Sequence, residues 1–132
     1  MMTNSESMRA PTLLDSFRFA FAGVWYVLRT QRNAQIHTTV AALIAVLGVF
    51  LRIPLTHWAI MVLTMGFVIV AEMFNTVAET ALDVATTDYH PLVKVGKDVA
   101  AGAVLVTAIT AVLIGLLILG PPLWQMASRY LF

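Results

Sequence analysis

The sequence predicts an all-α membrane protein in which one amphipathic surface helix precedes three membrane-spanning helices. The chain of 132 residues is 60% hydrophobic and only 11% charged, whereas soluble domains average about 25% charged residues. Three long stretches contain no Asp, Glu, Lys or Arg, and each is long enough to cross a bilayer as a helix. The length of residues 1–132 fits a single domain.

Residues 1–11 are polar and are predicted to form a disordered lead-in. The surface helix is predicted at residues 12–30, where Thr12 and Asp15 have the spacing of a capping box. Apolar residues follow at helical spacing, but Asp15, Arg18 and Arg29 interrupt them. This pattern favours a helix that lies in the membrane interface over one that spans it. A plain anchoring role is the simpler interpretation of this helix, and a direct contact with substrate is the alternative.

The three spans are predicted at residues 33–51, 56–84 and 98–120. The second span is long because its acidic residues keep helical register as far as Asp83, so its last turns should emerge from the bilayer. Pro91 is interpreted as a helix breaker in the loop that follows. Pro121 and Pro122 are expected to end the third span.

The basic residues predict the orientation of the chain in the cell's inner (plasma) membrane. One side would carry six of them and the other side two: Arg9, Arg18, Arg29, Arg32, Lys94 and Lys97 against Arg52 and Arg129. Positive residues accumulate on the cytoplasmic side, so the N-terminus and the 85–96 loop should be cytoplasmic and the C-terminus outside. No basic patch is large enough for nucleic acid. The lack of cysteine excludes disulfides and thiolate metal sites.

A polar stripe on the second span is the most informative feature of the sequence. Glu72, Asn75, Glu79 and Asp83 are spaced 3, 4 and 4 residues apart. At 100° per residue, all four lie within a helix face roughly 80° wide. Carboxylates at membrane depth are costly and usually face a partner, a cavity or a substrate. The stripe therefore predicts a polar site near one membrane surface.

The residue types in the stripe suit phosphoryl transfer. Mg²⁺ prefers one or two carboxylates together with substrate phosphates, and Lys97 could neutralise a nucleotide phosphate as a point charge. Such transfer also needs a base on the acceptor hydroxyl, and Glu72 lies about 10 Å deeper than Glu79 along the helix axis. That depth suits a group that meets a lipid headgroup from within the membrane.

Other functions fit the same residues. Buried carboxylates also serve as structural partners between subunits or as proton carriers. A catalytically inactive structural membrane oligomer and a small proton-coupled transporter subunit are therefore the alternatives. Asp98 could simply cap the third span. His37 and His57 are interpreted as interfacial and His90 as a loop residue, so none is expected to bind metal.

The segment that contains the stripe resembles the signature of the small prokaryotic diacylglycerol kinase family, which includes undecaprenol kinases. The matching pattern consists of Glu72, Asn75, Glu79, Asp83, His90, Lys97, Asp98, Ala100, Ala101 and Gly102. The resemblance implies a homotrimeric bundle of three-span chains with a surface helix and with active sites between subunits. It implies ATP-dependent phosphorylation with Mg²⁺. The acceptor would be a membrane lipid alcohol, either diacylglycerol giving phosphatidic acid or undecaprenol giving undecaprenyl phosphate.

Carried over by position, the resemblance implies that Glu72 is the catalytic base and Glu79 a metal ligand. It implies that Asn75, Lys97 and Asp98 bind the nucleotide or organise the site. The chain departs from the family at Gln31-Arg32-Asn33, where members usually have a glutamate. This departure leaves the number of bound metal ions open, and no residue indicates the length of the lipid acceptor.

Overall fold

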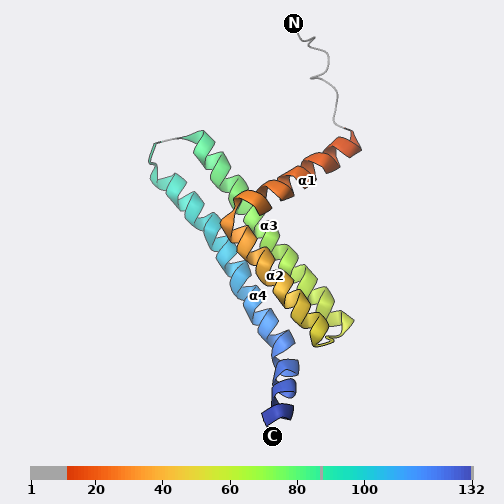
Figure 1. Cartoon of the computed structure of the whole chain (residues 1–132). Helices are drawn as coiled ribbons and strands as arrows, with labels where there is room; N and C mark the ends of the chain where they lie inside the picture. The colour runs from red at the N-terminus through yellow and green to blue at the C-terminus, as the bar shows by residue number, and fades with distance from the viewer. Residues whose placement is uncertain (1–11, 87, 132) are drawn as a thin grey trace.

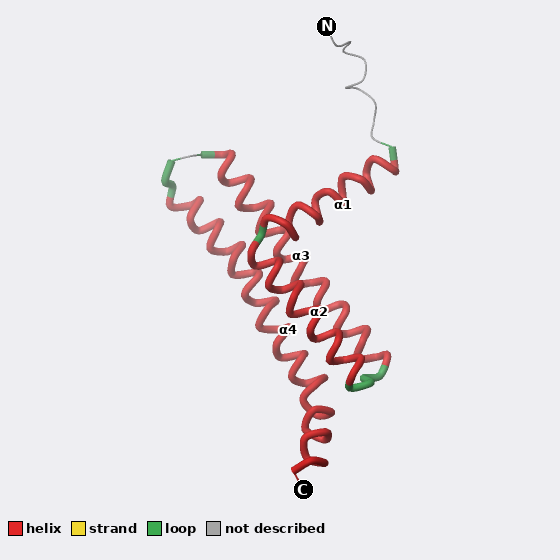
Figure 2. The backbone as a smooth tube through the Cα atoms, viewed as in Figure 1, coloured by secondary structure: helices red, strands yellow, loops and turns green. Residues whose placement is uncertain are grey.

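The computed structural model describes residues 12–86 and 88–131, and the regular structure of these residues is entirely helical (Figures 1 and 2). The four helices are α1 (Leu13–Thr30), α2 (Arg32–Phe50), α3 (Leu55–Ala85) and α4 (Pro91–Leu131). The last three are long and apolar enough to cross a membrane, by their length and composition. The predicted all-α chain with three helices of spanning length is therefore confirmed. The predicted lead-in at residues 1–11 lies outside the described residues.

α1 begins where the sequence predicts, because Thr12 and Asp15 form a capping box. The backbone N–H of Asp15 donates to the Thr12 hydroxyl at 3.2 Å, and the N–H of Thr12 donates to the Asp15 carboxylate at 3.0 Å. These two bonds satisfy donors that the first turn of a helix otherwise leaves free. Gln31 ends α1 and also caps α2. The chain therefore changes direction within one residue, and α1 projects away from the other helices (Figure 1).

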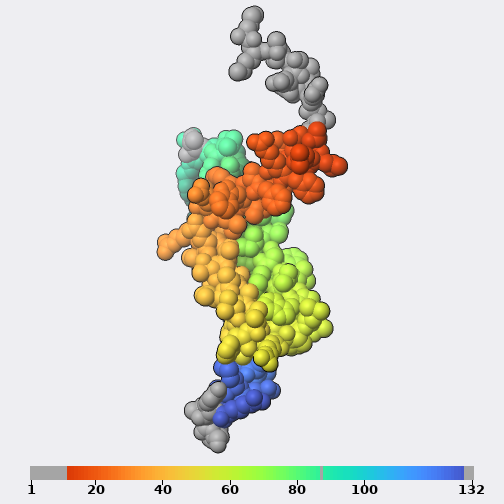
Figure 3. Space-filling model, turned by 45° about the vertical axis from the view of Figure 1, so that its right-hand side comes forward, coloured from red at the N-terminus to blue at the C-terminus, as the bar shows by residue number. Residues whose placement is uncertain are grey.

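The other three helices form a bundle in which α3 is central. α3 packs extensively along α4, and α2 lies against α3 on another side. Figure 3 shows the C-terminal part of α4 extending past the end of the other two helices. A small buried cluster lies in the half of the bundle that contains the α2–α3 turn, and it consists of Ile53, Met61, Ile118 and Leu119. The opposite half, near the α3–α4 loop, contains the polar stripe.

A close approach of the backbone to a side chain fixes the α2–α3 turn. A Cβ atom on Gly48 would lie 3.1 Å from Cζ2 of Trp58 and 3.2 Å from Cδ1 of Ile53. Glycine therefore lets the indole of α3 rest against the backbone of α2. In the turn itself Arg52 has a φ of 51°, in the left-handed region that few residues other than glycine adopt.

α4 differs from the predicted third span at both ends. It begins at Pro91 rather than at residue 98, and it continues through Pro121 and Pro122 rather than ending before them. Proline suits the first helical position, where its fixed φ is favourable and its missing N–H is not needed. The two internal prolines redirect the helix instead of ending it, and the ribbon changes direction near them (Figure 1). The predicted loop at 85–96 is therefore shorter in the structure, where α3 ends at Ala85 and α4 already begins at Pro91.

Candidate active site

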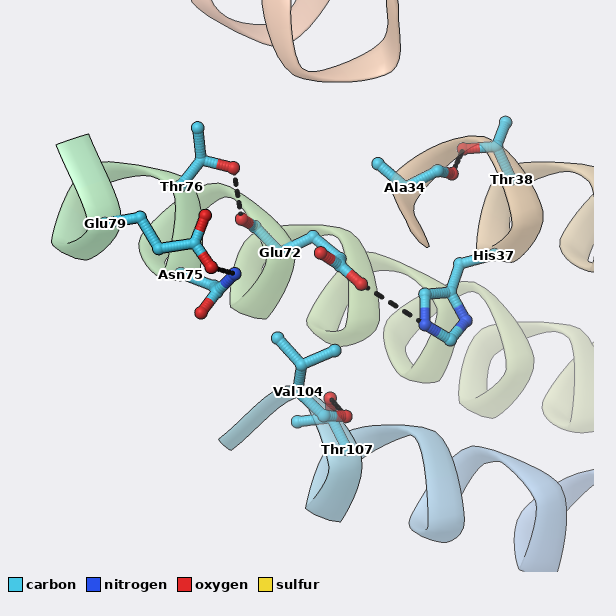
Figure 4. A network of polar contacts seen from close by, with 9 residues as sticks. All are labelled: Ala34, His37, Thr38, Glu72, Asn75, Thr76, Glu79, Val104 and Thr107. Carbon is cyan, nitrogen blue, oxygen red and sulfur yellow. Dashed lines mark hydrogen bonds and ion pairs between the residues drawn. The ribbon is translucent and has the colours of Figure 1, made fainter. Parts of the chain in front are cut away.

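The polar stripe lies on a continuous stretch of α3, and Figure 4 shows its three inner residues, Glu72, Asn75 and Glu79. Glu72 is 1% exposed, and it is the largest fully buried side chain among the described residues. Asn75 and Glu79 are half-buried, and Asp83 is exposed. The stripe therefore runs from a buried carboxylate at depth to an exposed carboxylate near the end of α3.

Asn75 and Glu79 are joined by a hydrogen bond one helical turn apart. Nδ2 of Asn75 donates to Oε1 of Glu79 at 3.1 Å. Oδ1 of Asn75 is buried and accepts no hydrogen bond from the described residues. A buried acceptor without a partner is destabilising, by about 1–3 kcal/mol in proteins generally. This pair therefore presents a carboxylate and an unpartnered amide oxygen side by side.

Glu72 meets His37 of α2, a contact that sequence reasoning did not predict. Nε2 of His37 lies 3.3 Å from Oε1 of Glu72, within ion-pair distance. The two groups are not oriented as in a hydrogen bond, so Oε1 of Glu72 has no hydrogen-bond donor among the described residues. A small rotation of the imidazole would direct its N–H at the carboxylate without moving the ring away. His37 was interpreted as an interfacial residue, yet a polar ring within an apolar span is itself a signal of function.

Thr76 lies in the next turn of α3 but does not donate a hydrogen bond to the Glu72 carboxylate. Its hydroxyl donates to the backbone carbonyl of Glu72 at 2.9 Å. This bond satisfies a hydroxyl that is buried with the stripe. The carboxylate of Glu72 therefore has His37 as its polar neighbour from another helix.

The outer end of the site is held by two ion pairs. Lys97 of α4 pairs with Asp83 of α3, and Lys94 pairs with Asp98 one turn later in α4. Because Asp98 lies inside α4, the alternative that it caps the third span is wrong. These four residues line an open pocket of about 510 Å³ between the ends of α3 and α4. The other lining residues are Thr86, Asp88, Tyr89, His90 and Val93.

The structure thus divides the predicted site residues into two groups. Glu72, Asn75 and Glu79 are adjacent on α3, whereas Lys97 and Asp98 line the pocket at the loop end. Asp83 links the groups, because it continues the stripe and also pairs with Lys97.

The stripe offers ligands of the type that Mg²⁺ prefers, but one chain does not offer a full set. Glu79 supplies a carboxylate and Asn75 an unpartnered oxygen, and both are hard oxygen donors. In the part of the chain that the structure describes, no three His, Asp or Glu side chains converge on one point. Gln31 and Asn33, at the junction of α1 and α2, add no carboxylate. These residues fit Mg²⁺ bound jointly with phosphates, which complete its coordination.

Comparison with known proteins links this arrangement to one family. The model of the prokaryotic diacylglycerol kinase family matches residues 18–119. The chain is 44% identical over 115 residues to a diacylglycerol kinase of Synechocystis, a match that covers 86% of this chain but 66% of that protein. It is 40% identical over 108 residues to the undecaprenol kinase of Bacillus subtilis, a match that covers 82% of this chain and 88% of that protein. A diacylglycerol kinase of Helicobacter pylori is 33% identical over 108 residues, a match that covers 76% of this chain and 84% of that protein.

Proposed function

Because the chain belongs to the prokaryotic diacylglycerol kinase family of lipid kinases, we propose that it transfers the γ-phosphoryl group of ATP to the hydroxyl of a membrane lipid alcohol. The single observation that best supports this proposal is the Glu72 carboxylate, which is buried and has an oxygen without a hydrogen-bond donor among the described residues. A group of this kind is suited to accept a proton from a substrate that enters from the membrane. The names of the relatives include both diacylglycerol and undecaprenol kinases, so both lipids are candidate acceptors.

In this proposal Glu72 acts as the general base. It takes the proton of the lipid hydroxyl as the hydroxyl oxygen forms a bond to the γ-phosphorus. The bond between that phosphorus and the β–γ bridging oxygen breaks, and ADP leaves with the electron pair. The products are a lipid phosphate, ADP and a proton on Glu72. The depth of Glu72 in the stripe supports this role, because the hydroxyl of a membrane lipid reaches the site from the bilayer side.

Glu79 and Asn75 would hold Mg²⁺ and orient the phosphates at the middle of the stripe. When bound, the ion supplies charge neutralisation on the transferring phosphoryl group. Lys97 would attract the nucleotide phosphates as a point charge, and Asp98 would keep Lys94 in place beside the pocket. The positions of these residues support their roles. Asn75 and Glu79 lie in the middle of the stripe on α3, and Lys97 and Asp98 line the pocket at the loop end of α4.

The proposed arrangement in the membrane follows from the exposed apolar residues and the basic residues. Phe67 and Leu117 are 60% and 76% exposed in the single chain, although both lie in helices of spanning length. We propose that lipid and neighbouring subunits cover these faces in a homotrimer. α1 would lie on the surface of the inner (plasma) membrane. The N-terminus and the loop before Pro91 would be cytoplasmic, where ATP is available, and the C-terminus would be outside.

Two other functions were compatible with the stripe alone. A structural oligomer does not need the unpartnered Asn75 oxygen beside the Glu79 carboxylate. A proton-coupled transporter subunit does not need a lysine such as Lys97 beside the stripe. Membership of a kinase family favours neither of them.

The proposal is tested by labelled transfer with the purified chain in detergent micelles. The protein is incubated with γ-labelled ATP and Mg²⁺, and with either diacylglycerol or undecaprenol. We expect label in at least one lipid, and the more active arm identifies the acceptor. No label in either lipid, from protein that still binds an ATP analogue, would refute the kinase proposal for these acceptors.

The same assay tests the base through Glu72→Gln. The amide keeps the shape of the side chain but cannot take a proton, so single-turnover transfer should fall by roughly 10²-fold or more. Binding of a non-hydrolysable ATP analogue should survive, because Lys97 and Glu79 lie further out. If the variant instead loses nucleotide binding and keeps its chemical rate, Glu72 belongs to the metal site rather than to the base.

A further inference from the structure

The buried carboxylate of Glu72 has a basic neighbour that comes from a different helix. In the described part of the chain, His37 is the basic side chain found within 4.0 Å of this carboxylate. The other titratable group of the stripe near it is Glu79, whose negative charge repels that of Glu72. A buried carboxylate beside a second carboxylate is unstable unless a donor or a positive charge compensates it. The imidazole of His37 is placed where such compensation is needed.

The position of His37 also indicates that it does more than pack α2 against α3. His37 lies in the second turn of α2, and its ring points toward the Glu72 side chain across the α2–α3 contact (Figure 4). The His37 side chain is 26% exposed, whereas that of Glu72 is 2% exposed. The exposed part of His37 lines an apolar cavity of about 490 Å³ between α2 and α4. The ring therefore stands between the buried carboxylate and an open space that is otherwise almost entirely apolar.

We propose that His37 is a positioning residue for Glu72. This inference rests on the proposed function, because it concerns the orientation of the base in the lipid kinase reaction. A carboxylate presents a productive lone pair only over a narrow range of orientations, and a misplacement of about 1 Å can cost roughly a hundredfold in rate. His37 Nε2 attracts Oε1 from the α2 side. It thereby limits rotation of the carboxylate toward Asn75 and Glu79 and keeps Glu72 directed at the acceptor hydroxyl.

The inference requires that His37 act through Glu72 and not through the nucleotide. His37 belongs to neither the Asn75–Glu79 pair nor the pocket that contains Lys97. Its loss should therefore lower kcat and leave the KM for ATP unchanged. A residue that merely packs α2 against α3 would instead change stability, with no selective effect on kcat.

The test is a double-mutant cycle in single-turnover phosphoryl transfer. The set is wild type, His37→Leu, Glu72→Gln and the double variant, each purified in detergent with its thermal unfolding recorded. His37→Leu should lower the transfer rate by roughly tenfold to a hundredfold. In the Glu72→Gln background the same change should have no further effect, because effects of residues that act as a unit do not add. His57→Leu, which removes a histidine from the first turn of α3, is the matched control and should keep the wild-type rate.

A conservative variant keeps the inference testable if His37→Leu fails to fold. The Nε2 of glutamine can occupy a position close to the Nε2 of histidine, so His37→Gln should retain more activity than His37→Leu. The proposal is overturned if His37→Leu transfers phosphate at the wild-type rate. It is also overturned if His37→Leu slows transfer as strongly in the Glu72→Gln background as in wild type. Wild-type transfer to the lipid is measured in parallel, so failure of the proposed function would appear separately as inactive wild-type protein.

Discussion

Two oxygens in the stripe, one from Glu72 and one from Asn75, are buried without hydrogen-bond donors among the described residues. Most buried polar atoms in folded proteins have a partner, and each exception requires a specific explanation. Both exceptions lie within one turn of each other on α3, and the Asn75 amide also donates to the Glu79 carboxylate. A bound ion and a substrate hydroxyl would satisfy oxygens of this kind. The Asn75 oxygen has no polar partner among the described residues and the Glu72 oxygen has only the His37 contact, which is consistent with a site that ligands complete.

Glu79→Gln should abolish turnover by weakening Mg²⁺ binding while the fold stays intact. Glutamine keeps the shape of the side chain and can still accept from Asn75, but it lacks the charge that Mg²⁺ requires. At limiting Mg²⁺ we expect transfer to fall by about a hundredfold or more. Asp15→Asn removes an equal charge from α1 and serves as the control. Full activity of Glu79→Gln at limiting Mg²⁺ would show that Glu79 is not a ligand.

Thr12→Ala should raise the pKa of Asp15 toward its ordinary value of 3.8. Hydrogen bonds from the side chain and then the backbone of Thr12 hold this pKa below that value, because they favour the charged carboxylate. The carboxylate's contribution to the start of α1 is therefore present above pH 3.8 and is lost as pH falls through the lowered pKa. Carbon NMR of labelled aspartate gives the pKa directly.

Ser16→Ala is the matched control for this measurement. The Ser16 hydroxyl donates to the backbone carbonyl of Thr12 and not to the carboxylate. Its removal should leave the pKa of Asp15 where it is in the wild type. An unchanged pKa in Thr12→Ala would mean that the capping box does not set the charge state of Asp15.

The contrast between the stripe and His37 shows what a sequence reveals about a site. The spacing of Glu72, Asn75 and Glu79 is enough to place them on one face, because helical geometry fixes angles within a single element. The side chain that another helix brings to that face depends on packing between helices, which short-range periodicity does not encode. His37 was therefore not predicted, although the structure places it 3.3 Å from Glu72. The pairing of Lys97 with Asp83 across the α3–α4 loop was not predicted for the same reason.

At the level of the elements, proline explains where prediction and structure differ. Pro91, Pro121 and Pro122 were all interpreted as ends or breaks of helices, and α4 includes all three. Local propensity disfavours proline inside a helix by about 3 kcal/mol. The helix nevertheless continues through Pro121 and Pro122, and the bend near them accommodates the hydrogen bonds that proline cannot make.

The α2–α3 contact provides a test of close packing between elements. Alanine favours a helix over glycine by about 1 kcal/mol, so Gly66→Ala, where the new methyl meets open space, should be neutral or stabilising. Gly48→Ala places its methyl against Trp58 and Ile53, and the overpacking should offset that gain and cost about 1–3 kcal/mol. Thermal unfolding in detergent compares the two variants. A lower Tm for Gly66→Ala than for Gly48→Ala would contradict this account of the turn.

For the whole molecule, the sparse core is the main observation. Among the residues that the structure describes, eight hydrophobic ones are buried in the single chain, whereas large apolar side chains are exposed along every helix. A soluble chain with this surface would aggregate, but a bilayer and neighbouring subunits can cover it. The metal-ligand set is likewise incomplete within one chain among the described residues. Both observations support the proposed homotrimer, in which a neighbouring chain would supply contacts that this chain lacks.

The proposed orientation in the membrane can be mapped with single cysteines, because the chain has none of its own. Asp88 lies in the loop before α4 and Gln125 near the end of α4, and both are exposed. In intact cells a membrane-impermeant maleimide should label Gln125→Cys and spare Asp88→Cys, which should react only after the cells are permeabilised. The cysteine-free wild type is the control for background labelling. Labelling of Asp88→Cys in intact cells would reverse the orientation and place the loop away from ATP.

The pairing of Lys97 with Asp83 has a consequence for nucleotide affinity. If Lys97 binds phosphate as proposed, the chain carries its own competing anion, and ATP must displace a carboxylate to reach the amine. The two side chains are 39% and 63% exposed, and pairs of this kind contribute about 0–1 kcal/mol. Loss of this ion pair by itself would therefore weaken ATP binding by no more than about fivefold. The same carboxylate would become an uncompensated charge once ATP binds, and it would then repel the triphosphate and favour release of the product nucleotide.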